Sequence, residues 1–426
     1  MAASSSKNAI GSPPSETLAK TVSHLAESPG LREGLLALSR ERQWINEQHL
    51  QVCRVPAATF FEKRRAEWMQ AQFLALGWES QIDRSGNVIA YQPSASAGPF
   101  VALTAHLDTV LAPRTPEEIT IGHDGRFTGP GISDNGSGLA ALLAIAKVYS
   151  LCPALEGNPL SLLLAANVGE EGEGNLSGMR YLCRQSPLGA RIRAFVVLDG
   201  PSTEHITYQA LASRRYEISF SGPGGHSWSD YGVGNPVHAL ARAISRFADA
   251  HAALPSAPRS SFNFGIIEGG LSVNSIPSSA RAKLDIRSEN PARLEESAEV
   301  LSACVERALE VERERASSGR IGARVKEIGS RPGGKLPEDS ALLGCLRTVD
   351  AFLNIHSRLD CASTDANLPL SLGIPAVSIG AGGSGGGAHT LSEWFHPDGR
   401  DRGLKRILLT LALLLKTSPA PSSTGQ

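Results

Sequence analysis

Histidine and carboxylate side chains follow short apolar segments at several points of the chain. Some of these segments read as strands that end in such residues, for example ALTAHLD at 102–108 and RAFVVLDG at 193–200. A further histidine, His389, lies in the glycine-rich stretch GAGGSGGGAHTLSEW at 380–394. Imidazoles and carboxylates are the ligands and acid–base groups of divalent-metal sites. The side chains in question are His106, Asp108, Asp134, Glu170, Glu171, Asp199 and His389.

We expect these side chains to converge, because ligands in open α/β sheets collect at the carboxyl ends of the strands. Two imidazoles and three carboxylates, one of them able to bridge, would satisfy two divalent cations about 3.5–4 Å apart. Mixed nitrogen and oxygen ligands suit zinc first, then cobalt or manganese. Asp108 is placed to orient the imidazole of His106. Adjacent Glu170 and Glu171 diverge, so one is expected to bind metal and the other to act as general base.

The elements that must position these residues alternate between apolar strands and helices. Continuous apolar strands at 100–105, 160–167 and 193–198, with helical segments such as 138–149 between them, predict a mostly parallel sheet with helices on both faces. The same α/β style returns after residue 331, where 376–379 reads as a further strand.

From about residue 213 the pattern changes to strand–helix–strand–strand–helix–strand, the ferredoxin-like α+β order. Asn235-Pro236 and Asn290-Pro291 begin its two helices, with Asn as the cap and Pro in the first turn. We therefore expect an insertion at 213–330 within a discontinuous catalytic domain at 21–212 and 331–426. Residues 1–20 are expected to form a disordered tail.

The overall composition excludes several classes of partner. With 41 basic and 42 acidic residues among 426, the chain has no general field to attract nucleic acid or an anionic membrane. The longest apolar run, at 407–415, is about half of the ~20 residues that a membrane span needs. Residues 1–15 lack the apolar core of a signal peptide. Scattered cysteines without a CxxC pair favour a reducing, cytoplasmic location.

Taken together in this order, the motifs resemble those of a known family. The stretches are HLDTV (106–110), GPGISDNGSG (129–138), GEEGEG (169–174), VLDG (197–200), GPGGHS (222–227) and GAH (387–389). They resemble the peptidase T, glutamate carboxypeptidase and aminoacylase family of co-catalytic zinc hydrolases, from about residue 55 to residue 394. The resemblance implies a zinc-peptidase-like catalytic domain with an inserted lid that also serves dimerisation.

The resemblance also implies roles for single residues. His106 and Asp199 would hold one metal ion, Glu171 and His389 the other, and Asp134 would bridge the two. Glu170 would be the general base and acid, with Asp108 as the partner of His106. The peptide between Asp134 and Asn135 would be cis.

Three lid residues carry further implied roles. His226 would reach into the active site of the partner subunit and stabilise the oxyanion. Asn274 and Arg287 resemble residues that bind the substrate carbonyl and carboxylate, a task that suits the planar fork of arginine. Arg287 could equally form half of a surface ion pair.

The function predicted from the sequence is a dinuclear zinc-dependent hydrolase that cleaves amide bonds of short peptides. The expected mechanism uses a metal-bridged hydroxide with Glu170 as base, and the expected assembly is a homodimer through the lid. Whether it would be an amino- or a carboxypeptidase stays open. The alternative is an aminoacylase-like amidohydrolase that acts on N-acyl amino acids at the same metal site. A second class of zinc aminopeptidases shares the DN-x-SG stretch, but the inserted lid argues against it. A catalytically dead binding protein is disfavoured because every expected ligand is present.

Overall fold

The computed structural model describes residues 16–95 and 98–417 and divides into two compact units. Unit 1 is built from the chain up to Tyr208, from Lys335–Asp360 and from Thr364 onward. Unit 2 is built from Gln209–Gly334 and Cys361–Ser363. The insertion expected at 213–330 falls inside unit 2.

A nine-stranded sheet forms the centre of unit 1, in the order β1-β2-β6-β3-β7-β17-β8-β15, with β16 paired to β8. The central strands β6, β3, β7 and β17 are parallel, whereas β1, β2 and β8 pair antiparallel to their neighbours. The short β1–β2 connection cannot make the crossover that a parallel pair needs. The predicted α/β fold with a largely parallel sheet is therefore confirmed. The strands are β1 (Glu79–Ile82), β2 (Val88–Tyr91), β3 (Phe100–His106), β6 (Ser161–Asn167), β7 (Ile192–Leu198), β8 (His205–Ala210), β15 (Gly334–Lys335), β16 (Arg358–Ala362) and β17 (Ala376–Ile379).

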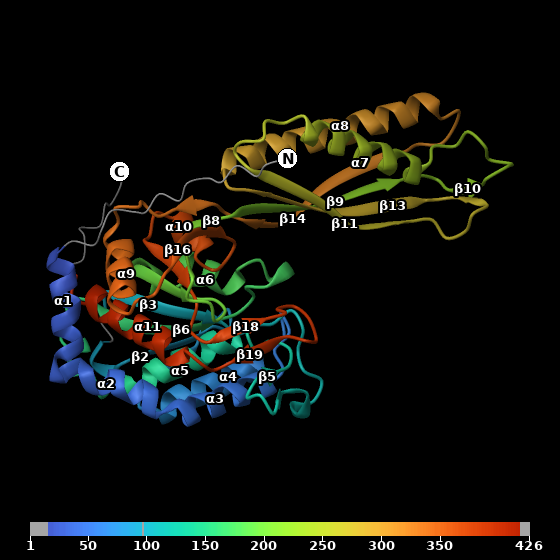
Figure 1. Cartoon of the computed structure of the whole chain (residues 1–426). Helices are drawn as coiled ribbons and strands as arrows, with labels where there is room; N and C mark the ends of the chain where they lie inside the picture. Colours follow the sequence, from blue (N-terminus) through green and yellow to red (C-terminus); the bar gives the residue numbers. More distant parts are fainter. Residues whose placement is uncertain (1–15, 96–97, 418–426) are drawn as a thin grey trace. The chain divides into compact units, whose positions relative to one another are not determined.

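Helices lie on both sides of this sheet (Figure 1). They are α1 (Glu16–Glu27), α2 (Pro29–Arg40), α3 (Arg42–Arg54), α4 (Lys63–Ala75), α5 (Gly136–Tyr149), α6 (Ser177–Arg184), α9 (Ala341–Phe352), α10 (Asn367–Ser371) and α11 (Arg400–Leu414). A small second sheet, in the order β18-β19-β5-β4, consists of β4 (Thr120–Ile121), β5 (Phe127–Thr128), β18 (Ser384–Gly386) and β19 (Trp394–His396). Short 3-10 turns lie at Pro93–Ala95, Pro116–Glu118, Pro153–Leu155, Gly172–Gly174 and Gly189–Arg191.

Two deeply buried elements of unit 1 lead into the candidate site. Every residue of β3 is buried, and α5, rich in Ala and Leu, is buried along almost its whole length. Asn135 caps α5 by accepting a hydrogen bond from the Gly138 N–H. The Asn135 amide also donates to the Leu198 carbonyl at 2.7 Å, so the start of α5 is tied to the end of β7.

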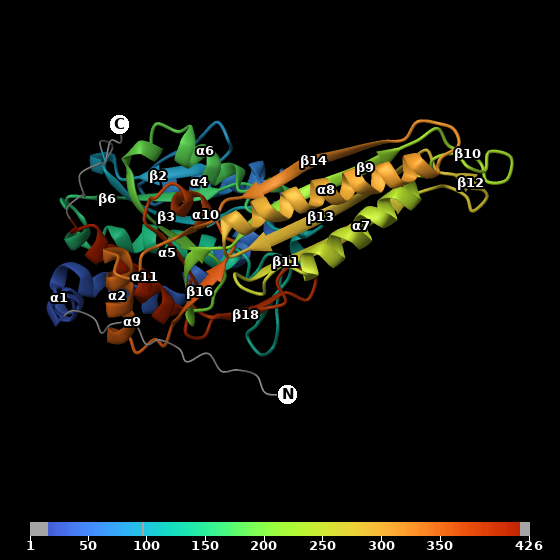
Figure 2. The same cartoon turned by 90° about the horizontal axis from the view of Figure 1, so that it is seen from above.

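Unit 2 has the predicted ferredoxin-like order. Its four-stranded antiparallel sheet runs β11-β13-β9-β14, and both helices lie on the same face of it (Figures 1 and 2). Asn235 and Asn290 cap the two helices through their side-chain oxygens, as predicted. The elements are β9 (Ala212–Ser221), β10 (Gly225–His226), α7 (Pro236–Ala252), β11 (Ser260–Gly269), β12 (Ser275–Ile276), β13 (Ser279–Ser288), α8 (Pro291–Arg315) and β14 (Gly322–Arg331).

The start of the chain differs from the prediction. Residues 16–20 were expected in a disordered tail, but they form the first turns of α1. This helix is ordered because it buries Val22 and Leu25 in packing against α2, α9 and α11. The rest of the predicted tail, residues 1–15, lies outside the described residues. Within the described ranges, no helix combines the length and the apolar character that crossing a bilayer requires.

A buried ion pair joins α9 to α11. The Arg406 guanidinium is fully buried and donates to both carboxylate oxygens of Asp350, each at 2.6 Å. The pair lies far from the predicted ligands in the sequence, and apolar patterning gives no sign of it.

Replacing Asp350 with Ala should lower the free energy of unfolding by about 3–5 kcal/mol, because it leaves a buried guanidinium without its carboxylate. The matched control is Lys20→Ala, which removes the exposed Lys20–Glu16 pair and should cost less than about 1 kcal/mol. Chemical denaturation measures both. Equal unfolding midpoints for Asp350→Ala and the unmodified protein would show that the buried pair contributes nothing.

Candidate metal centre

The structure brings the predicted metal-type residues together at the carboxyl edge of the central strands of unit 1. His106 is the last residue of β3, Asp199 follows β7, and the Glu170–Glu171 pair lies just beyond β6. Asp134 precedes α5, and His389 comes from the loop between β18 and β19. Three groups have ligand atoms within 4.8 Å of one another: His106–Asp134–Asp199, Asp134–Glu171–His389 and His106–Glu170–Glu171.

The first two of these groups share Asp134. Its Oδ1 lies 3.1 Å from Nε2 of His106, and its Oδ2 lies 3.2 Å from Nε2 of His389. Nε2 of His389 is also 2.9 Å from Oε1 of Glu171. The two oxygens of one carboxylate therefore face two different imidazoles, an arrangement suited to bridging. The Asp134–Asn135 peptide is cis, as the resemblance implied.

Burial and carboxylate crowding together shape the electrostatics of the cluster. Burial raises the pKa of Asp199 well above its ordinary value, and the nearby Asp134 carboxylate raises it further. Burial, together with Glu170 and Asp134, raises the pKa of Glu171 to about 7. Burial alone would raise the pKa of Asp134 as well, but hydrogen bonds from His106 and His389 lower it.

The pKa values of the imidazoles are raised as well, because nearby carboxylates favour the charged imidazolium form. Hydrogen bonding to Asp134 raises the pKa of His389 to about 9. The cluster therefore needs positive charge, and its nitrogen and oxygen donors are those that zinc, cobalt and manganese accept. The residues present fit divalent cations.

Asp108 is fully buried and fixes the segment that carries the two glutamates. Its Oδ1 accepts from the Glu170 N–H at 3.0 Å, and its Oδ2 accepts from the Glu171 N–H at 2.9 Å. The Asp108 carboxylate is 3.6 Å from Nδ1 of His106, whereas its backbone oxygen is only 2.9 Å away. The imidazole of His106 is thus oriented chiefly by the backbone carbonyl, which leaves Nε2 facing the cluster.

Glu393 is a structurally important residue that the sequence reasoning missed. It is 2% exposed and accepts hydrogen bonds from the backbone N–H groups of Gly131, Ser133 and Asp134 at 2.7–2.9 Å. It therefore holds the loop that carries Asp134. Its position four residues after His389 was the available signal, but a lone acidic residue in a polar loop is indistinguishable from a solvated one.

His226 and Asn274 lie together in unit 2. β10 pairs with β12, and the Ser227 N–H donates to the Asn274 carbonyl at 3.0 Å. Nδ1 of His226 accepts from the Trp228 N–H at 3.2 Å, so the neutral ring carries its proton on Nε2. The ring is exposed.

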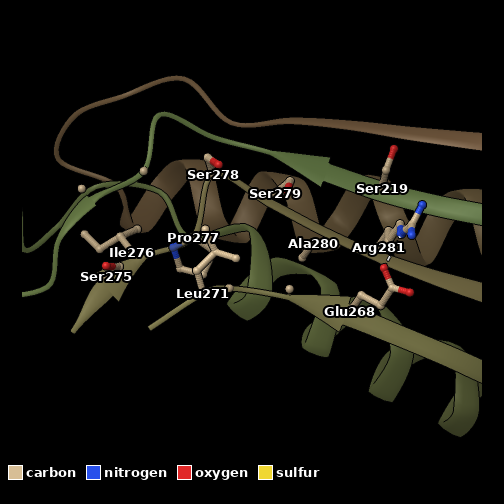
Figure 3. Close-up of a pocket in the computed structure, with 14 residues that line it drawn as sticks. Ser219, Glu268, Leu271, Ser275, Ile276, Pro277, Ser278, Ser279, Ala280 and Arg281 are labelled. Carbon is tan, nitrogen blue, oxygen red and sulfur yellow. Dashed lines mark hydrogen bonds and ion pairs between the residues drawn. The ribbon is translucent and has the colours of Figure 1, made fainter. Parts of the chain in front are cut away.

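Beside this paired segment is a cavity of about 590 Å³. Its wall includes Gly225 and Ser275, the neighbours of His226 and Asn274. Figure 3 shows residues that line this cavity, among them Glu268 at the end of β11 and Arg281 at the start of β13, whose side chains pair at 2.6 Å.

Arg287 does not join this group. It lies near the other end of β13 from Ser279, roughly 25 Å along the strand at 3.3 Å per residue. Its Nε donates to Asp285 at 2.7 Å, and Arg215 holds the other oxygen of Asp285 at 3.1 Å. Of the two readings left open by the sequence, the ion pair is the one that the structure displays.

Comparison with known proteins gives separate matches for the two parts of the chain. Residues 87–228 match the model of Peptidase family M28, and residues 212–313 match the Peptidase dimerisation domain of the M20 type. A curated relative from Aspergillus terreus, named "Probable carboxypeptidase", is 31% identical over 212 residues, which are 47% of this chain and 47% of the relative. The chain spans about half the length of the curated relatives it matches.

Solved structures with the same fold cover most of the chain. A tripeptidase from Staphylococcus aureus has a TM-score of 0.72 at 20% identity, over 88% of this chain and 99% of that one. A dipeptidase from Saccharomyces cerevisiae also has a TM-score of 0.72, at 13% identity, over 92% of this chain and 100% of its own. At these identities the similarity shows the fold. These matches confirm the resemblance to peptidases predicted from the sequence: the chain joins a region similar to Peptidase family M28 to a region similar to the M20-type peptidase dimerisation domain.

Proposed function

We propose that the chain is a dinuclear metal-dependent hydrolase that cleaves amide bonds of short peptides. The observation that carries this proposal is the pair of ligand groups that share Asp134, at the carboxyl edge of the sheet. His106 and Asp199 would hold one cation, Glu171 and His389 the other, and Asp134 both. Zinc suits these donors first, with cobalt or manganese next. When bound, such cations lower the pKa of a coordinated water toward neutrality and polarise a carbonyl group.

Glu170 is the proposed general base. Its side chain is 5% exposed, and its backbone N–H is fixed by Asp108, so the carboxylate is held beside the cluster. Glu171 is the proposed ligand, and Glu170 would take the proton of the attacking water. It then returns that proton to the leaving amine.

Unit 2 supplies the proposed oxyanion donor. Nε2–H of His226 can donate to the carbonyl oxygen as negative charge develops on it. Asn274, adjacent to His226, would bind the same carbonyl. Arg287 would have to leave Asp285 before it could bind a substrate carboxylate.

The proposed assembly is a homodimer through unit 2, in which His226 serves the active site of the partner. The dimerisation-domain match supports this assembly. β11 is an edge strand of its sheet, and its Ile267 side chain is 63% accessible. The backbone of such an edge can pair with a strand of a second subunit.

Replacing Glu170 with Gln should lower kcat by about 10²-fold to 10⁴-fold, because the amide cannot accept the proton. The bound metal should be unchanged, since Glu170 is not a proposed ligand. Metal analysis together with peptide hydrolysis separates the two effects. Loss of both cations along with activity would reassign Glu170 from base to ligand.

The substrate class is tested with metal-replete enzyme on di- and tripeptides with free and blocked termini, beside N-acyl amino acids. We expect peptides to be cleaved faster than acyl amino acids. The name of the Aspergillus terreus relative supports a need for a free carboxyl terminus. Faster turnover of acyl amino acids would instead establish the aminoacylase-like alternative. Absence of metal from a sample grown in excess zinc would overturn the enzyme proposal.

Mixing two inactive variants tests the sharing of His226 between subunits. A dimer of one Glu170→Gln and one His226→Ala subunit contains one complete site if His226 acts in the partner, and none if it acts within its own subunit. Activity should therefore rise well above that of either variant alone after the subunits exchange. The control replaces the second partner with the Glu170→Gln/His226→Ala double variant, which cannot complete any site. A mixture as inactive as this control would place His226 in its own subunit's site.

A further inference from the structure

The loop at residues 131–134 delivers Asp134 to the cluster, and its backbone is held from two sides. Glu393 accepts from the N–H groups on one side. The carbonyls of Gly131 and Ser133 accept from the Gly136 N–H at 2.9 Å and from the Ser137 hydroxyl at 2.6 Å, both from the start of α5. The carbonyl of Ile132, which lies between these two residues, turns toward α3 and accepts from the imidazole Nε2 of His49 at 2.5 Å.

His49 is fully buried, and its proton position is determined by its two partners. Nη2 of Arg400 lies 2.6 Å from Nδ1 of His49, and a guanidinium can only donate. The Ile132 carbonyl can only accept. The ring is therefore neutral, with its proton on Nε2, which it donates to Ile132.

Arg400 is itself fixed. Its Nη1 donates to the Asn46 side-chain oxygen at 2.9 Å, and its guanidinium stacks over the Phe395 ring at 4.4 Å. The His49 ring packs edge-on against Phe127 and Phe395, with centroids 5.6 and 4.6 Å away. Burial, reinforced by the Arg400 cation, keeps the pKa of His49 well below its ordinary value, which agrees with a neutral ring.

The fit between α3 and the loop leaves no spare room. A Cβ at Gly136 would lie 2.3 Å from Sγ of Cys53, 2.8 Å from the Gly131 carbonyl and 3.0 Å from Nε2 of His49. Cys53 and His49 are four residues apart on α3, so one face of this helix contacts both the loop and the first residue of α5. A displacement of His49 would be transmitted to Asp134.

We propose that His49, locked by Arg400, is a positioning residue that holds the Asp134 loop in its metal-binding conformation through the Ile132 carbonyl. This inference rests on the proposed function, because it assumes that Asp134 binds metal. It adds a residue on α3 that contacts neither metal ligand nor substrate. Outer hydrogen-bonding partners of this kind typically change metal affinity by about 10-fold to 100-fold.

Two near-isosteric variants separate the two hydrogen bonds of His49. His49→Asn keeps an acceptor near the Nδ1 position for Arg400 but loses the donor to Ile132. His49→Gln places an amide N–H near the Nε2 position and keeps that donor. The readout is zinc affinity of the full chain, measured by competition with a chromophoric chelator, beside the thermal unfolding midpoint.

We expect zinc affinity to fall about 10-fold to 100-fold in His49→Asn and to stay near that of the unmodified protein in His49→Gln. The control is Val148→Ala, which leaves a cavity at the opposite end of the buried helix α5. This control should lower the unfolding midpoint without changing zinc affinity.

Two outcomes would overturn the inference: unchanged zinc affinity in His49→Asn, or equal losses in His49→Asn, His49→Gln and Val148→Ala. The latter would show that His49 contributes only to general stability. Asp134→Asn separates this failure from that of the proposed function. If the unmodified chain binds zinc and Asp134→Asn weakens it while His49→Asn does not, only the inference fails. If the unmodified chain binds no zinc, both the proposed function and this inference fail.

Discussion

Mutual repulsion among buried carboxylates is the constraint around which unit 1 is organised. Asp134, Glu170, Glu171 and Asp199 converge where four parallel strands end, and the raised pKa values of Asp199 and Glu171 reflect first their burial and then that crowding. Backbone hydrogen bonds hold in place the segments that carry these residues. Asp108 and Glu393 provide them, because each accepts backbone N–H groups from a segment that carries the clustered residues. These hydrogen bonds thus fix the candidate ligands in place through the backbone.

Much of this arrangement could be predicted because the ends of the strands are recognisable in the sequence. The segments ending at His106 and Asp199 combine a mostly apolar strand with a polar terminus, and parallel pairing places such termini at one edge. The helix starts at Asn235 and Asn290 were equally predictable, since an Asn cap followed by Pro is a local signal.

The residues that position the site could not be predicted from the sequence, for a physical reason. Glu393 and His49 act through backbone atoms of a loop more than 80 residues away in the sequence. Backbone carbonyls and N–H groups carry no residue identity, so nothing in the loop's own sequence indicates which side chain will bind it. Arg287 shows the converse difficulty. Its partner Asp285 is only two positions away, yet a strand arginine looks the same whether it binds a substrate carboxylate or its neighbour.

The order of the ligands along the chain has a consequence for biosynthesis. His389 and Glu393, and the strand β17 that lies between β7 and β8, all follow the inserted unit 2 in the sequence. A nascent chain that has emerged only as far as Gly334 already contains His106, Asp134, Glu171 and Asp199, but it lacks the residues that close the centre. Because domains fold as they leave the ribosome, unit 2 can fold while the centre is still open. The loop that carries His389 and Glu393 is translated after Gly334, so it can join the candidate metal centre only after residues 209–334 of unit 2 have been made.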